Sequence, residues 1–175
     1  MQKHALTLTT ALCVGLAAAC GSDKSTAPAN ITYVANLAAS NEVTASGSSA
    51  GVVSTGTGTW TGVLNPTTNV LTWTMTFSGL TTNSTASHIH AQAPTSSTAS
   101  VVLNFATFAG STITLGGTSG TASGSINLAT QVATPPSLTI SGDSLLKAMN
   151  AGQAYVNVHT SQYGAGEIRG QIIKQ

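Results

Sequence analysis

The amino-acid sequence predicts an all-β domain, arranged as an antiparallel Greek-key sandwich or barrel with one short helix. Apolar side chains recur at every second residue along most of the chain, which is the period of a strand with one buried face. Thr, Val and Ile are plentiful while Glu, Lys and Arg are scarce, and this bias favours strands over helices. Clusters of Gly, Ser and Thr separate the alternating runs, as expected for turns between many short strands.

The clearest strand is predicted at residues 71–77, where four large apolar side chains alternate with three threonines. Alternation places the apolar side chains on one face, so that face is expected to pack inward while the threonines meet water. Residues 57–64 alternate in the same way, and the intervening residues 65–69 have turn chemistry. The two runs are therefore predicted to form a hairpin.

The same period predicts the remaining strands at residues 32–38, 50–54, 87–91, 101–105, 123–128, 138–141, 154–160 and 166–173. One segment, residues 144–151, has a helical pattern. Asp143 or Ser144 is expected to cap the start of this helix, and Gly152 is expected to end it.

The composition excludes some classes of function. Only 5% of the residues are Asp, Glu, Lys or Arg, the net charge is +1, and Ser and Thr make up more than a quarter of the chain. Without a cluster of Lys and Arg to displace counterions, the protein is not expected to bind nucleic acid. No apolar run reaches the roughly 18 residues that a membrane-spanning helix needs. The mature chain is long enough for one domain with a substantial core.

Residues 1–20 are predicted to be an export signal. A short positive start precedes an apolar stretch, and three alanines precede Cys20. Cys20 resembles the lipidated cysteine of bacterial lipoproteins, although Ala17 stands where their lipobox usually has Leu. Because Cys13 would leave with the signal, Cys20 would be the only cysteine of the mature chain, and no intramolecular disulfide is expected. The alternative is a freely secreted protein that starts with Cys.

After the export signal, the chain is expected to consist of a flexible tether over residues 21–30 and a single domain over residues 31–175. The resemblance to lipoproteins implies an exported protein held by its acyl chains on the extracytoplasmic side of a membrane. Gly21 stands where inner-membrane lipoproteins of Gram-negative bacteria commonly have Asp, which favours the outer membrane if the cell has one.

Three histidines are candidate metal ligands. His88 and His90 are two residues apart on a predicted strand and therefore project from the same face. His159 ends another predicted strand, and it is the only other histidine in the domain. If the two strands are neighbours, three imidazoles could share one ion such as copper or zinc. The alternative is that the histidines are structural or are simply exposed on a polar strand face.

Glu167 and Arg169 are the other candidate site residues. Alternation places them on one face, with Ile168 on the opposite face, so they are predicted to form an ion pair. If exposed, such a pair stabilises a sheet by at most about 1 kcal/mol. If buried, it is expected to fix strand register or to meet loop carbonyls.

Several segments resemble the CHRD family, the domain first described in chordin and widespread in bacterial exported proteins. The matching segments are YVANL with NEV at residues 33–43, ASHIHA at 86–91, and AGQAYVNVHT with GEIRGQI at 151–172. Thr44 stands where the family usually has Pro, so this loop is expected to differ in shape. The resemblance implies a β-sandwich module whose biochemical role is mostly unknown, associated in chordin with growth-factor binding.

A more distant likeness is to Cu/Zn superoxide dismutase, in the order of the motifs HIH, VNVH and GEIRG. It implies copper-ligand positions for His88, His90 and His159, and an anion-guiding role for Arg169. The zinc-side ligands of that enzyme have no counterpart here, so a binuclear site is not expected.

The leading hypothesis is therefore a lipid-anchored binding or structural module of the cell envelope, without catalysis. Its expected partners are an envelope protein or a glycan, and no cofactor is required. The alternative is a mononuclear copper protein, with copper handling or redox chemistry at the three histidines. A third hypothesis gives these histidines a purely structural role.

Overall fold

A computed structural model describes residues 27–130 and 139–175. The predicted export signal and Cys20 lie outside the described residues, as does most of the predicted tether. The strands are β1 (Ile31–Ala38), β2 (Thr57–Asn65), β3 (Val70–Ser78), β4 (Ser84–Ala91), β5 (Val101–Asn104), β6 (Ser111–Ile113), β7 (Gly120–Asn127), β8 (Ala154–Thr160), β9 (Ile168–Gln171) and β10 (Ile173–Lys174). A short 3-10 helix, η1 (Ala39–Asn41), follows β1, and one α-helix, α1 (Gly142–Asn150), precedes β8.

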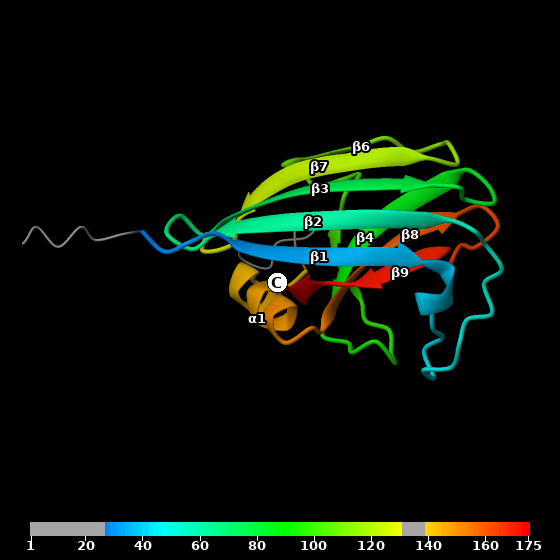
Figure 1. The fold of residues 1–175 in the computed structure, drawn as a ribbon, viewed down its shortest axis with the longest axis horizontal. Coiled ribbons are helices and arrows are strands. Elements are labelled where there is room, and N and C mark those ends of the chain that lie inside the picture. The colour runs from blue at the N-terminus through cyan, green and yellow to red at the C-terminus, as the bar shows by residue number, and fades with distance from the viewer. Residues whose placement is uncertain (1–26, 131–138) are drawn as a thin grey trace, which may run out of the picture.

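The strands form one ten-stranded sheet in the order β5-β4-β8-β9-β1-β2-β3-β7-β6, with β10 also paired to β1. Neighbouring strands are antiparallel throughout. Figure 1 shows that the sheet curls, so that β4, β8 and β9 lie opposite the layer made by β1, β2, β3 and β7. The prediction of an antiparallel all-β fold with one short helix is confirmed.

The core lies inside this curl. Along β3 the side chains alternate strictly between buried and exposed, and every exposed position between its apolar residues is a threonine. Both tryptophans are buried, Trp60 on β2 and Trp73 on β3. The predicted hairpin is confirmed, because β2 pairs with β3 along its whole length from Thr57↔Ser78 to Asn65↔Val70.

Two strand predictions are wrong. Residues 50–54 form no strand, because beyond one backbone bond from Ala50 to the Glu42 carbonyl the segment is bound by side chains. The Ser54 hydroxyl donates to Glu167, and the backbone of Val53 bonds the Tyr163 hydroxyl. In the segment 138–141, Leu138 lies outside the described residues, and residues 139–141 lead into α1 without strand structure.

The predicted strand 166–173 is divided at Ile172 into β9, which pairs with β8, and β10, which pairs with β1. The three-residue strand β6 was not predicted, because so short a segment carries little alternation.

The helix begins earlier than predicted. The Ser141 hydroxyl accepts the backbone N–H of Ser144, so Ser141 is the N-cap rather than Asp143 or Ser144. Gly152 follows the helix with a φ of +64°, which is the left-handed conformation that favours glycine after a helix end. Figure 1 places α1 at one end of the curled sheet, near the C-terminus. No helix within residues 27–130 and 139–175 is long and apolar enough to cross a membrane.

The strands β4, β8 and β9 are covered on both faces. One face carries apolar residues such as Ile89, Val156 and Ile168 and packs into the core. The other face carries polar side chains, and loops cover it. Carbonyls of residues 93–99 and of Gly164 accept hydrogen bonds from these side chains, and the Asn41 amide donates to the Arg169 backbone. This polar second face positions the candidate site.

Candidate metal centre

The three histidines lie on two neighbouring strands. β4 pairs with β8 in the register His88↔Asn157 and His90↔Tyr155, and His159 faces Ala86. The condition that the metal hypothesis set, that the two strands are neighbours, is therefore met. One ring nitrogen from each histidine can be chosen so that all three lie within 4.8 Å of one another. We call His88, His90 and His159 the His cluster.

Backbone carbonyls set the orientation of two of the rings. His90 Nδ1 lies 2.8 Å from the carbonyl oxygen of Ala99, and His159 Nδ1 lies 3.0 Å from that of Gly164. Because a carbonyl only accepts, each Nδ1 must carry the hydrogen, which leaves Nε2 with a free lone pair when the ring is neutral. Metal-binding histidines commonly have this arrangement, in which the second ring nitrogen donates to a carbonyl and fixes the tautomer.

The free nitrogens of these two rings differ in their surroundings. His159 Nε2 accepts from His88 Nδ1 at 3.0 Å, so a metal ion would have to displace this hydrogen bond. It also lies 3.1 Å from Asn157 Oδ1, to which a neutral Nε2 without hydrogen cannot donate. His90 Nε2 is buried and has no hydrogen-bond partner among the residues that the structure describes. A buried nitrogen lone pair without a partner is costly, and a metal ion would satisfy it.

The widest nitrogen–nitrogen separation in the cluster exceeds the roughly 4 Å that three ligands of one ion allow. Zinc–nitrogen bonds of about 2.0–2.1 Å place the nitrogens of a tetrahedral site roughly 3.3–3.5 Å apart. His88 and His159 are already nearer than this, and the cluster's widest separation of 4.8 Å would have to contract by about 1 Å or more. This contraction requires small side-chain rotations against the hydrogen bonds that hold His90 and His159 to the Ala99 and Gly164 carbonyls. Imidazole nitrogens suit zinc, copper, iron and nickel.

All three imidazoles are held in their neutral form. Burial lowers the pKa of His88 to about 4, with further lowering by His159 and then by His90. Burial also lowers the pKa of His90, with opposing effects from the Ala99 carbonyl and the nearby Asn157 side chain and further lowering by His159 and Arg169. Burial lowers the pKa of His159 against the effect of its hydrogen bond to Gly164. At neutral pH the protons therefore do not compete with a metal ion for the ring nitrogens.

Tyr155 and Arg169 support the cluster from one side. The His90 ring stacks on Tyr155, with centroids 4.6 Å apart and an angle of 3° between the planes. The Arg169 guanidinium carbon lies 3.5 Å from the Tyr155 ring centroid. Because β8 lies between β4 and β9 in the sheet, Tyr155 stands between His90 and Arg169. The stack restricts the rotation of the His90 ring and of Tyr155.

The predicted ion pair between Glu167 and Arg169 is not formed. The Glu167 carboxylate is fully buried and accepts hydrogen bonds from the Ser54, Thr81 and Thr160 hydroxyls and from the Thr81 backbone. Arg169 Nη2 instead donates to the Pro94 carbonyl and to the side chain of Gln171. Four hydrogen bonds satisfy the carboxylate without Arg169, which is the physical reason for the difference.

Glu42 is a further buried acidic residue, and it lies near Arg169. Its side chain is buried, and its Oε1 has no hydrogen-bond partner in the described part of the chain. Burial raises the pKa of Glu42 to about 7, although the nearby Arg169 lowers it. The only signal in the sequence was that Glu42 is one of very few charged residues, within the NEV segment. Its proximity to Arg169 follows from the fold, because the two residues are distant in sequence.

The fold and the cluster define an all-β domain with a three-histidine polar site on its second face. A family model, described as CHRD domain, matches residues 33–172. The match covers most of the chain, so the chain belongs to the CHRD family. Comparison with curated proteins gave no match, and comparison with solved structures gave none.

Proposed function

We propose that this CHRD domain is an exported, membrane-anchored module that binds one copper or zinc ion through His88, His90 and His159. The main support for this proposal is the buried Nε2 of His90. This nitrogen belongs to the His cluster and lacks a hydrogen-bond partner among the described residues. Three neutral nitrogen ligands leave a further coordination position open, which is the arrangement of sites that exchange ligands.

Copper is expected to bind more tightly than zinc. The cluster contains nitrogen ligands only, and for such ligands the divalent copper ion binds more strongly than the other first-row divalent ions. The likeness to Cu/Zn superoxide dismutase is confined to the motif order, and the proposal includes no catalytic step. Contact with an envelope protein or a glycan remains a prediction.

The test is an equilibrium titration of the purified chain with Cu(II) and with Zn(II), in competition with a chromophoric chelator. Cys13→Ser and Cys20→Ser substitutions in all samples remove the thiols, which would otherwise bind copper. We expect one ion per chain, with affinity lowered on the order of 100-fold in a His90→Ala variant.

When the chain is produced in the cytoplasm so that residues 1–20 stay attached, it offers a matched control, because His4 is its only histidine outside the cluster. A His4→Ala variant is expected to bind as the unsubstituted chain does. Far-ultraviolet circular dichroism checks that each variant is folded. Stoichiometric binding that persists in a His88→Ala, His159→Ala double variant would overturn the proposal.

A further inference from the structure

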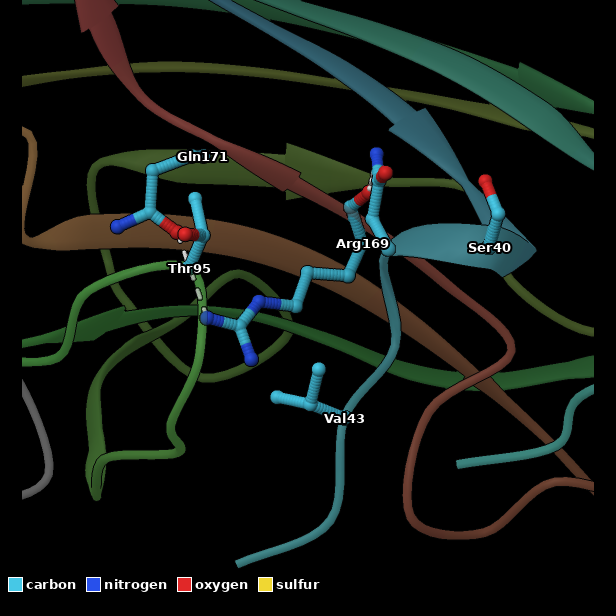
Figure 2. Close-up of a pocket in the computed structure, with 6 residues that line it drawn as sticks. Ser40, Val43, Thr95, Arg169 and Gln171 are labelled. Carbon is cyan, nitrogen blue, oxygen red and sulfur yellow. Dashed lines mark hydrogen bonds between the residues drawn. The ribbon is translucent and has the colours of Figure 1, made fainter. Parts of the chain in front are cut away.

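A second polar site lies on the other side of Tyr155 from His90. It is a pocket of about 270 Å³ where η1 and the loop after β4 meet β9. Its lining residues are Ser40, Asn41, Val43, Thr95, Arg169 and Gln171. Figure 2 shows the Arg169 side chain extending into this pocket, with its guanidinium group between Thr95 and Val43. We call this site the Arg169 pocket.

Arg169 is incompletely paired there. Its side chain is 1% exposed, and only Nη2 has partners, at 3.1 Å from the Pro94 carbonyl oxygen and 3.3 Å from Gln171 Oε1. Nη1 is buried and has no hydrogen-bond partner among residues 27–130 and 139–175. A buried guanidinium N–H group without an acceptor is costly, so the pocket lacks one acceptor group.

Two lining side chains are already engaged and hold the pocket in shape. Gln171 Nε2 donates to the carbonyls of Ala93 and Gly152, while its oxygen accepts from Arg169. Asn41 Nδ2 donates to the backbone oxygen of Arg169 at 2.9 Å. These bonds join β9 to η1 and to the loop after β4, so the position of the guanidinium is fixed before any ligand arrives.

The remaining lining groups suit an anion. Ser40 and Thr95 are exposed and supply hydroxyl groups, and Val43 supplies an apolar edge. No lining residue carries a negative charge. Glu42 is the acidic group beside Arg169, and burial raises its pKa to about 7, so Glu42 only partly balances the guanidinium charge. The Glu167 carboxylate is occupied by its own four hydrogen bonds.

We propose that the Arg169 pocket binds a small organic carboxylate. One carboxylate oxygen accepts from Arg169 Nη1, the other accepts from the hydroxyls of Ser40 or Thr95, and the carbon skeleton contacts Val43. Arginine suits this recognition because its guanidinium stays charged and gives a charge-assisted hydrogen bond to a carboxylate oxygen. The inference does not depend on metal binding, because none of the lining residues belongs to the His cluster.

The test is a nuclear magnetic resonance titration of the metal-free chain with two sodium salts, propionate and glucuronate, at constant ionic strength. We expect saturable shifts of the Val43, Thr95 and Gln171 amides. Tighter binding of glucuronate would identify the acid group of a sugar as the source of the carboxylate, and tighter binding of propionate would identify a free short-chain acid. Absence of saturable shifts with both salts would overturn the inference.

Substitutions locate the site. Because Arg169 is buried and its loss could unfold the domain, the main variant is Thr95→Glu, at an exposed position that adds a negative charge to the pocket. We expect this variant to lower the affinity about tenfold through repulsion of the anion. The matched control is Thr74→Glu on the exposed face of β3, with unchanged affinity. Equal affinities in the two variants would contradict the assignment.

Discussion

Replacing Glu167 by Ala is expected to destabilise the domain severely. The carboxylate is fully buried and accepts four hydrogen bonds, with lengths of 2.5 Å from the Ser54 hydroxyl, 2.7 Å from the Thr81 backbone, 2.8 Å from the Thr81 hydroxyl and 2.7 Å from the Thr160 hydroxyl. Together these bonds connect the segment before β2, the segment before β4 and the end of β8. The substitution therefore removes the acceptor that three separate segments share.

The magnitude follows from the number of donors left without an acceptor. A hydrogen bond to a charged group contributes about 1.5–3 kcal/mol, and a buried donor without a partner costs about 1–3 kcal/mol. Some donors will reach water once the side chain is removed, so we expect a loss of about 3–5 kcal/mol. Thr81→Val removes one of the four bonds at an exposed residue and is expected to cost about 1 kcal/mol.

The assay is urea unfolding followed by tryptophan fluorescence, which reports on the core because Trp60 is 0% and Trp73 is 3% exposed. Thr76→Val, on the exposed face of β3, is the control and should leave the unfolding free energy within about 0.5 kcal/mol. A loss below about 1 kcal/mol for Glu167→Ala would refute the reasoning, because the carboxylate would then not hold the three segments together.

Three further predictions concern stability and location. The pKa of His88 is about 4 in the folded chain and near 6.5 when unfolded, so the unfolded state binds more protons between these pH values. The unfolding free energy of the metal-free domain should therefore fall by roughly 1–2 kcal/mol as the pH is lowered from 6.5 to 4. Urea unfolding at each pH measures this loss, and His88→Ala should make the unfolding free energy depend less on pH. Gly170→Ala should lower the unfolding free energy by about 1–3 kcal/mol, because a Cβ there would lie 2.5 Å from the backbone oxygen of Asn36 on β1. Thermal unfolding measures this loss, and a stability equal to that of the unsubstituted chain would contradict the close approach of β9 and β1. Cys20→Ser should move the protein from the membrane fraction to the soluble fraction of the expressing bacterium without changing its fold. If the variant stays in the membrane fraction, the anchor is not an acyl group on this residue.

The local parts of the fold could be predicted from the sequence. Strict alternation identified β3 and β8, and the turn residues between β2 and β3 identified the hairpin, because these signals come from neighbouring residues. The spacing of His88 and His90 likewise placed them on one face. That β4 and β8 are neighbours was only a condition of the metal hypothesis, because strand order depends on contacts between distant segments.

The charged residues show where sequence reasoning fails. Alternation paired Glu167 with Arg169, but the acceptor needs of Glu167 are met by Ser54 and Thr81, which are 113 and 86 residues away in sequence. Such partners can be identified only after the loops are placed on the sheet. The same holds for Glu42, whose burial beside Arg169 depends on the turn that follows β1.

Binding of one metal ion by three imidazole nitrogens is the proposal to test most directly. The most direct measurement is electron paramagnetic resonance of the chain loaded with one equivalent of Cu(II), in which nitrogen hyperfine splitting counts the coordinated nitrogens. We expect three coordinated nitrogens in the unsubstituted chain and two in the His90→Ala variant. A spectrum with no coordinated histidine nitrogen, or one that His90→Ala leaves unchanged, would contradict the proposal.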